Sequence, residues 1–267
     1  MTYDDYKTIL FEKGADKVAT ITINRPEAFN SFNRQMCIEF RNVWEKIRED
    51  DEVNAVVLRA SPGRAFCPGV DVRDRTGGSV LMYDDLFSQV DPGEYLGPKS
   101  NRLWKPVVTA VHGMCAGGAF YWINESDIVI CSEDATFFDP HVTYGMVAAL
   151  EPIGLTWRVP IAEVLRMALL GNDERIGAET AKRISLVTEV VKLEDLWGRA
   201  HQLAAKIAAK PSIATQGTNR AIWESLDMTR SAALLNGMKY TQIGNGPGTA
   251  QVNRDTVMAA AKQFEVR

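Results

Sequence analysis

The chain has 267 residues, of which 46% are hydrophobic and 24% charged, and its formal net charge at pH 7 is -4. This composition is that of a soluble globular protein with a sizeable core, and the interspersed charges exclude a dominant surface for nucleic acid or for an anionic membrane. The N-terminal residues lack a secretory signal and no apolar run approaches the ~20 residues of a membrane span, so we expect a cytoplasmic protein. The four cysteines form no C-x-x-C pair, which favours reduced structural thiols and predicts no metal site.

The first 60 residues predict a strand, a helix and a second strand. Val18–Ile23 alternates as a strand, and Arg25-Pro26 ends it because proline disfavours continued pairing. Asn33 can cap the next helix, whose buried face is predicted by apolar residues at helical spacing: Met36, Phe40, Val43, Trp44 and Ile47. Ala55–Ala60 is the second predicted strand.

The segment RAFCPGVDV, residues 64–72, follows that strand. It places Gly69 directly before Val70, in a turn where the backbone can approach a ligand closely. Residues 73–100 then change in composition, with Gly77-Gly78 and an Asp91-Pro92-Gly93 turn, and read as a partly helical insert.

Residues 105–127, KPVVTAVHGMCAGGAFYWINESD, predict an anion-binding turn. Val107–Val111 reads as a buried strand, and Gly117-Gly118 opens an apolar helix from Ala119. A helix that begins at paired glycines presents bare backbone N–H groups with partial positive charge. Since no Lys-Ser/Thr follows the glycines, as it would in a phosphate-binding loop, the expected anion is a carbonyl oxygen that gains charge during a reaction.

The rest of the chain predicts short strands followed by helices. Strands are expected at residues 128–131, 135–138 and 186–191, and helices at 161–170 and near 194–209, 213–226 and 230–242. Gly244–Gly248 is predicted to be a loop before a last helix from about Gln251. These elements predict an α/β fold.

Three segments together carry a resemblance to a known family. INRPEAFNSFNRQM at residues 23–36, residues 64–72 and residues 105–127 resemble the crotonase, or enoyl-CoA hydratase/isomerase, superfamily in order and spacing. The resemblance implies a spiral of strand-strand-helix units in residues 1–193, which hold the acyl-CoA site, and a helical oligomerisation region in residues 194–267. It also implies a homotrimer or a dimer of trimers.

The resemblance further implies the substrate and the residues around it. The substrate is an acyl-CoA thioester, and no cofactor is implied beyond the coenzyme A that the substrate carries. The family's oxyanion hole, formed by two backbone N–H groups, maps onto Val70 and Gly118. Residues implied to lie around the substrate or its CoA moiety are Arg25, Ala28, Ala65, Cys67, Gly69, Asp71 and Gly117. In the insert, Leu81, Leu86, Phe87 and Tyr95 either line the acyl pocket or pack locally.

The two glutamates that hold a water in the family's hydratases are replaced here by Tyr121 and His141. Ordinary two-glutamate hydration is therefore not expected. His141, with an ordinary pKa near ~6.5, can accept or donate a proton at neutral pH, whereas Tyr121, near ~10, stays protonated and donates a hydrogen bond. The alternative interpretation of His141 is a hydrogen-bonded structural residue at the pocket edge. The alternative interpretation of Tyr121 is an aromatic core residue on an apolar helix. His112 and His201 are interpreted as structural.

Glu151 is a third candidate catalytic residue. It lies in the apolar segment Ala148–Gly154, where burial would raise its pKa as a proton shuttle requires, whereas a loop glutamate is more often solvated. Asp139 is placed to orient the imidazole of His141, unless the two side chains point apart.

Three functions follow from these observations. The first is an enzyme that stabilises a thioester enolate and moves a proton, in isomerase, lyase or hydrolase chemistry. The second is a catalytically inactive acyl-CoA-binding protein that kept the anion site. The third, a protein-interaction scaffold, leaves two glycine-bounded backbone donors without a purpose.

Overall fold

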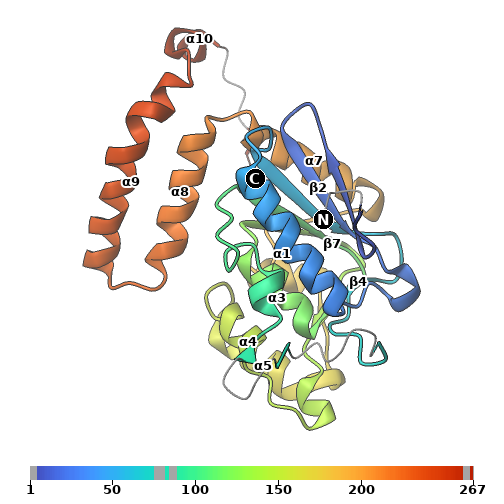
Figure 1. Ribbon diagram of the computed structural model, residues 1–267. Coiled ribbons are helices and arrows are strands. Elements are labelled where there is room, and N and C mark those ends of the chain that lie inside the picture. Colours follow the sequence, from blue (N-terminus) through green and yellow to red (C-terminus); the bar gives the residue numbers. More distant parts are fainter. Residues whose placement is uncertain (1–4, 75–81, 84–88, 261–264, 267) are drawn as a thin grey trace. The chain divides into compact units, whose positions relative to one another are not determined.

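A six-stranded sheet forms from the β-branched runs of the sequence (Figure 1). The computed structural model describes residues 5–74, 82–83, 89–260 and 265–266. The sheet has the order β1-β2-β3-β7-β9-β12, with β1 antiparallel to β2 and the other pairs parallel. Its strands are Ile9–Lys13, Val18–Ile23, Ala55–Ala60, Val107–Val111, Ile128–Ser132 and Glu189–Val191.

Successive side chains in a strand point to opposite faces of a sheet, and both faces of this sheet are covered. Val57 and Val108 pack against helix α7, Leu193–Ala208, whose residues Leu196, Ala200, Ala204 and Ala208 are buried at helical spacing. Val56 and Val107 belong to the main core on the other face, with α1, Arg34–Glu49. As predicted, Asn33 caps α1, accepting the Met36 N–H at 2.9 Å.

A second sheet of four short strands has the order β11-β10-β8-β4. Strands β4 (Ala65–Cys67), β8 (Met114–Ala116) and β10 (Thr136–Phe138) run parallel, and β11 (Ile176–Gly177) pairs antiparallel with β10. The predicted strands at residues 107–111 and 128–131 are thus confirmed in the first sheet, and residues 135–138 contribute to the second.

Short helices connect the strands. They are η2 (Pro26–Ala28), α2 (Gly93–Leu96), η3 (Gly117–Ala119), α3 (Phe120–Glu125), η4 (His141–Tyr144), α4 (Leu150–Leu155), α5 (Ile161–Leu170), η5 (Gly171–Asp173) and α6 (Ala178–Arg183), where η denotes a 3-10 helix. In the insert, β5 (Met82–Tyr83) pairs with β6 (Gln89–Val90). Leu81, Leu86 and Phe87 lie outside the described residues. Tyr95 packs under the Arg41 guanidinium, whose Cζ is 5.2 Å from the centroid of the tyrosine ring.

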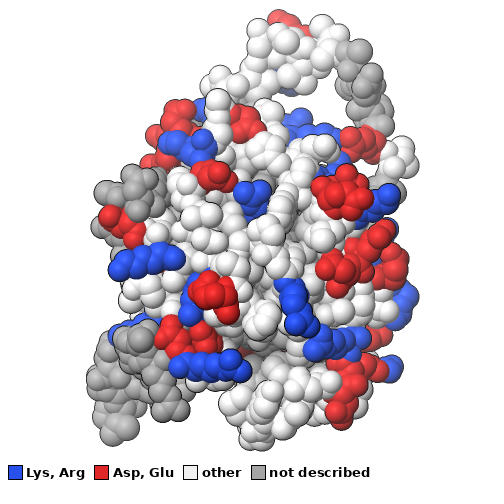
Figure 2. All heavy atoms as spheres, turned by 90° about the vertical axis from the view of Figure 1, so that its right-hand side faces the viewer, with Lys and Arg blue, Asp and Glu red and all other residues white. Residues whose placement is uncertain are grey.

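The chain divides into two compact units, residues 1–208 and 209–267. The sequence-based boundary at Leu193 grouped α7 with the C-terminal helices, whereas α7 packs on the six-stranded sheet of the first unit. All four cysteines are free and buried. None of the described helices is long and apolar enough to span a bilayer. Figure 2 shows one face of the molecule, on which positive and negative side chains are interspersed.

The second unit holds α8 (Ser212–Ser225), α9 (Arg230–Ala250) and α10 (Arg254–Ala259). The prediction of a loop at Gly244–Gly248 is wrong, because α9 continues through it despite Pro247. Packing explains the difference: Gly248 is buried against α8, where a Cβ would be in ordinary van der Waals contact with the Ala214 Cβ at 3.6 Å, so this part of α9 is packed on its neighbour. The last helix consequently starts at Arg254, after its cap Asn253.

Candidate functional site

Three parallel strands end side by side and bring the predicted site residues together. β8 lies between β4 and β10, and Phe138 pairs with Ala116 while Cys67 pairs with Cys115, so their carboxyl ends are level. The segments that leave these ends carry Val70, Gly118 and His141. Residues separated by more than 70 positions in the chain therefore meet at one edge of the second sheet.

The first predicted donor, Val70, lies in a turn that only glycine allows. Gly69 has φ +105°, and a Cβ there would lie 3.2 Å from the Ala116 oxygen and 3.4 Å from the Gly118 nitrogen. The Phe32 N–H donates to the Gly69 oxygen at 3.0 Å and the Asp71 N–H to the Phe32 oxygen at 2.8 Å. In this parallel bridge the N–H of Val70 points away from Phe32, and Val70 is 41% exposed.

The second predicted donor, Gly118, opens a helix. Gly117 has φ +52° and Gly118 lies in the first turn of η3, where backbone N–H groups have no acceptor within the helix. A Cβ at Gly118 would lie 2.5 Å from the Phe32 Cε1. The two donor turns therefore touch each other and share Phe32 as a neighbour.

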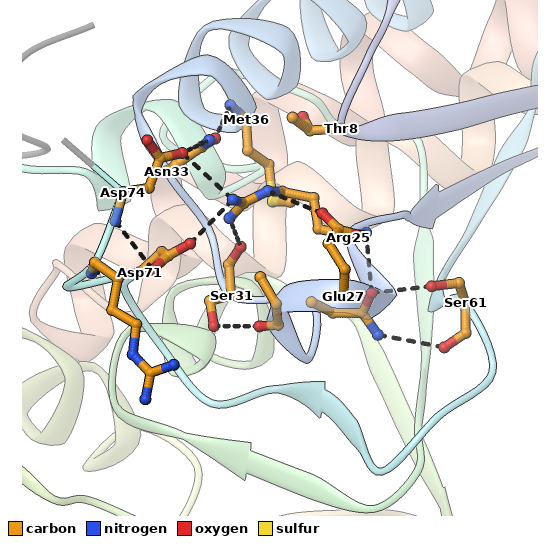
Figure 3. A network of polar contacts seen from close by, with 12 residues as sticks. Thr8, Arg25, Glu27, Ser31, Asn33, Met36, Ser61, Asp71 and Asp74 are labelled. Atoms are coloured by element: carbon orange, nitrogen blue, oxygen red, sulfur yellow. Dashed lines mark hydrogen bonds and ion pairs between the residues drawn. The ribbon is translucent and has the colours of Figure 1, made fainter. Parts of the chain in front are cut away.

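Arg25 and Asp71 hold the Val70 turn (Figure 3). The Arg25 guanidinium donates to the Asp71 carboxylate at 2.9 Å, to Asp74 at 3.3 Å and to the Ser31 oxygen at 2.7 Å. The other Asp71 oxygen accepts the N–H groups of Arg73 and Asp74 at 3.1 and 3.2 Å. Both residues were predicted to lie around the substrate, and their observed partners are protein groups that fix the donor loop.

The other predicted CoA-contact residues surround these turns. Ala28 ends η2 and is partly exposed, whereas Ala65 and Cys67 are fully buried in β4. The Ala65 oxygen accepts the Asn30 amide at 2.9 Å, and the Cys67 sulfur accepts the Gly69 N–H at 3.4 Å. Burial raises the pKa of the Cys67 thiol to about 12, so it is neutral. The side chains of Ala65 and Cys67 are therefore shielded from solvent and do not face an open site.

His141 and Asp139 form a hydrogen-bonded pair at the end of β10. Nδ1 of His141 lies 2.6 Å from Oδ1 of Asp139, and the same oxygen accepts the His141 N–H at 3.0 Å. Asp139 is fully buried, and its hydrogen bond raises the pKa of His141. A Cβ at Gly117 would lie 3.7 Å from the imidazole Cε1, so His141 borders the glycine turn. The sequence left open whether these side chains point apart, and they do not.

Glu151 lies on the other side of the imidazole. Its Oε1 is 3.8 Å from Nε2 of His141, and it is 6% exposed, unlike a solvated loop glutamate. Burial raises the pKa of this carboxyl. Helix α4 carries it, and α4 is held on α3 by the Asn124 amide, which donates to the Glu151 backbone oxygen at 2.9 Å. Gly154 permits this approach, since a Cβ there would lie 2.3 Å from Asn124 Nδ2.

Tyr121 completes the cluster. Its hydroxyl donates to Oδ2 of Asp91 at 3.0 Å, and burial followed by the charges of Glu151 and Asp91 raises its pKa, so the phenol is neutral at physiological pH. Carboxyl groups thus alternate with other hydrogen-bonding groups beside the two predicted backbone donors. The cluster consists of Asp139, His141, Glu151, Tyr121 and Asp91.

Asp91 contacts Tyr121 but was not among the predicted site residues. The sequence signals only a turn at Asp91-Pro92-Gly93, and a contact with a tyrosine 30 positions away leaves no local pattern. Of the two histidines interpreted as structural, His112 is buried beside Trp197, with ring centroids 6.2 Å apart, and His201 Nε2 lies 2.8 Å from Asp16. Neither contacts the cluster.

Comparisons with known proteins agree on one family. A family model described as enoyl-CoA hydratase/isomerase matches residues 13–241. A 1,2-epoxyphenylacetyl-CoA isomerase from Escherichia coli (strain K12) is 33% identical over 81% of this chain and 82% of its own length. An (E)-benzylidenesuccinyl-CoA hydratase from Thauera aromatica is 29% identical over 83% of this chain and 84% of its own length. The crystal structure of an enoyl-CoA hydratase/isomerase from Mycobacterium paratuberculosis superposes with a TM-score of 0.87 at 33% identity, covering 98% of this chain and 100% of that chain.

Proposed function

Because the chain belongs to the enoyl-CoA hydratase/isomerase family, we propose that this acyl-CoA-processing enzyme moves a proton within its thioester substrate. The names of its relatives include both hydratases and isomerases, so the choice of reaction rests on the acid and base groups of this chain. Those groups favour isomerisation, in which a double bond changes place and no atom is gained or lost.

In this proposal the backbone N–H groups of Val70 and Gly118 bind the thioester carbonyl oxygen. Removal of a proton from the acyl chain places negative charge on that oxygen as an enolate. Fixed donors that need no reorganisation stabilise such charge strongly, and one of them is typically worth about 10²- to 10³-fold in rate. Support comes from the close approach of the two turns, since a Cβ at Gly69 would lie 3.4 Å from the Gly118 nitrogen.

The spacing of His141 and Glu151 carries the proposal. With 3.8 Å between Nε2 and Oε1, two proton-transfer groups face one region beside the donors. We assign the Glu151 carboxylate as the base that breaks one C–H bond, whose electrons extend the conjugation to the carbonyl oxygen. The imidazolium of His141, stabilised by Asp139, then donates a proton to a different carbon. The proton on Glu151 returns to His141, and the pair is restored.

Two-glutamate hydration fits these residues poorly. Tyr121 occupies one glutamate position, and its hydroxyl already donates to Asp91. A neutral phenol with a raised pKa is a poor base for water. Tyr121 is assigned here as a hydrogen-bonding neighbour of the acid and base pair.

The test is isotope exchange in deuterated water, followed by mass spectrometry. Enoyl-, dienoyl- and 3-hydroxyacyl-CoA thioesters are incubated with the wild type, with His141→Ala and with His201→Ala as a control for loss of a histidine elsewhere. We expect deuterium in the acyl chain with the wild type and the control, and a decrease of about 10²-fold or more with His141→Ala.

Other outcomes of this experiment select other functions. A gain of the mass of water would establish hydration, and release of free CoA would establish thioester hydrolysis; either would overturn isomerisation. Binding of the thioesters without exchange or product would favour the inactive acyl-CoA-binding protein.

We also infer that copies of this chain assemble through its C-terminal helices, as a homotrimer or a dimer of trimers. In the described part of the chain, α8 has no buried residue and α9 has only Gly248, although both helices carry exposed apolar side chains such as Leu234, Leu235 and Ile222. A helix pair with so little burial is marginal by itself. A groove of about 720 Å³ between them is lined by Ile222, Leu234 and Gly237.

Native mass spectrometry tests this assembly. We expect masses of three or six chains for the wild type, and a shift towards smaller species for Leu234→Asp, which places a charge in the apolar groove. A monomer at micromolar concentration would contradict the inference.

A further inference from the structure

The turn η4, which carries His141, is bonded to a distant part of the chain. Within the turn, the His141 oxygen accepts the Met146 N–H at 3.0 Å, and Gly145 closes η4 with φ +73°. The distant contact comes from η5, where the Asn172 N–H donates to the Thr143 hydroxyl oxygen at 2.8 Å. Backbone bonds thus give η4 its internal form, and the side chain of Thr143 attaches it to η5.

Gly171 allows η4 and η5 to approach each other. It ends α5 with φ +61°, and a Cβ there would overlap the Thr143 hydroxyl oxygen and lie 3.1 Å from Val142 Cγ2. Any other residue would therefore strain the backbone and push η4 away. Gly171 is buried, so the turn lies directly on the end of α5. Close packing and a hydrogen bond together fix η4 against η5.

The segment from η5 to β11 also holds the strand that leads to His141. β11 pairs antiparallel with β10. Just before β11, the Arg175 guanidinium lies over the Phe138 ring, with Cζ 4.2 Å from the ring centroid. This segment therefore contacts the chain on both sides of Asp139, at β10 before it and at η4 after it.

We propose that Thr143 is a positioning residue for His141: its hydroxyl, bonded to η5, holds η4 so that the imidazole stays bonded to Asp139 and faces Glu151. This inference rests on the proposed function of His141 as a proton donor. In this assignment Thr143 contacts neither the thioester nor the reacting carbons, and it acts through the orientation of the turn.

The geometry that η4 must maintain is narrow. Nδ1 of His141 lies 2.6 Å from Oδ1 of Asp139, and Nε2 lies 3.8 Å from Oε1 of Glu151. Asp139 belongs to the end of β10 and Glu151 to α4, so a small rotation of η4 lengthens at least one of these distances. A displacement of about 1 Å in a reacting group can cost about 10²-fold in rate. An attachment that prevents such a rotation therefore affects proton transfer.

The charges around His141 provide a readout of its orientation. In the described structure, the charged groups that act on its imidazole are Asp139, from the end of β10, and Glu151, from α4. On the η5 side, the Glu174 carboxylate is bonded to the Arg166 guanidinium at 2.7 and 2.6 Å. The hydrogen bond to Asp139 is the largest influence and raises the pKa of His141, whereas burial lowers it. A loosened turn weakens that hydrogen bond, so the pKa falls.

The variants Thr143→Val and Thr143→Ser separate the hydroxyl from the shape of the side chain. Valine keeps the shape but cannot accept the Asn172 N–H, whereas serine keeps the hydroxyl. Because Thr143 is exposed, both variants should fold. We expect Thr143→Val to lower kcat for isotope exchange into the acyl chain by about 10-fold with little change in KM. Thr143→Ser should retain most of the wild-type kcat.

Thr188→Val is the matched control. It removes a hydroxyl bond of similar length, from Thr188 to the Val129 oxygen at 3.0 Å, between β9 and the start of β12. It should lower stability and leave kcat unchanged. Wild-type kcat in Thr143→Val would overturn the proposal, and so would a Thr143→Ser enzyme as impaired as Thr143→Val, because the hydroxyl would then not be the group that matters.

A readout without substrate distinguishes this inference from the proposed function. The chain has three histidines, so their imidazole signals can be titrated by NMR in protein labelled with ¹³C-histidine, and His141→Ala assigns the signal of His141. We expect its midpoint to fall by about half a pH unit in Thr143→Val and to stay unchanged in Thr143→Ser and Thr188→Val. If that holds while the wild type exchanges no thioester, the positioning role is right and the reaction is wrong. An unchanged midpoint in Thr143→Val contradicts the positioning role whatever the activity.

Discussion

Glu151→Gln is expected to lower isotope exchange into the acyl-CoA substrate by about 10²- to 10⁴-fold, the range typical for loss of a general base. Gln has the same shape and keeps the backbone oxygen that accepts the Asn124 amide, so α4 stays on α3. The Kd for the thioester should therefore change little. The measurement is exchange by mass spectrometry together with binding by calorimetry.

The pH dependence of this variant adds a second readout. Burial raises the pKa of Glu151, so wild-type activity should fall as the pH drops through that raised value and the base becomes protonated. Glu151→Gln has no such group and should lose this acidic limb. Glu194→Gln, at an exposed position of α7, is the control. Retention of full exchange by Glu151→Gln would remove Glu151 from the mechanism.

Gly118→Ala is the change with the second large expected effect, because it acts on both folding and the proposed oxyanion site. Its Cβ would lie 2.5 Å from the Phe32 ring, which is nearly fully buried and meets Trp122 edge to face at 6.0 Å. Overpacking of this kind costs about 1–3 kcal/mol in the free energy of unfolding. Displacement of the amide should also lower turnover by about 10²-fold, as loss of one oxyanion donor does.

Denaturant unfolding and turnover measure these two effects separately. Gly63→Ala is the control, because a Cβ there would meet nothing within 4 Å. Adding Phe32→Leu to Gly118→Ala should recover part of the stability, since the ring is the obstacle. If Gly118→Ala were as stable and as active as the control, neither the close packing at Phe32 nor the donor role would stand.

The fold could be predicted from sequence where the signal is local. β-branched runs correctly predicted the strands Val18–Ile23 and Val107–Val111, and the spacing of apolar residues correctly predicted the buried face of α1. The exception is α9, where Gly244–Gly248 has the composition of a loop. Contact with Ala214 on α8 outweighs that preference, and such a contact depends on a partner helix that local composition does not specify.

The candidate site likewise combines features that had a local signal in the sequence with features that had none. The turns at Gly69 and Gly117-Gly118 carry their signal in adjacent glycines, and the structure places them in contact. The pairing of His141 with Glu151 could be suspected only from residue type, and the bond between Tyr121 and Asp91 had no signal at all. Their roles depend on where α3, α4 and the start of α2 are placed by tertiary packing.

The level ends of β4 and β8 bear on how this enzyme could diverge from others of its family. In the proposed function, charge stabilisation depends on main-chain groups at strand ends, which side-chain replacements away from Gly69, Gly117 and Gly118 leave in place. The proposed proton transfer depends instead on side chains of residues 139–151 and of α3. The proposal therefore predicts that a lineage can exchange its acids and bases without rebuilding the core, while the main-chain donors stay the same and the reaction changes.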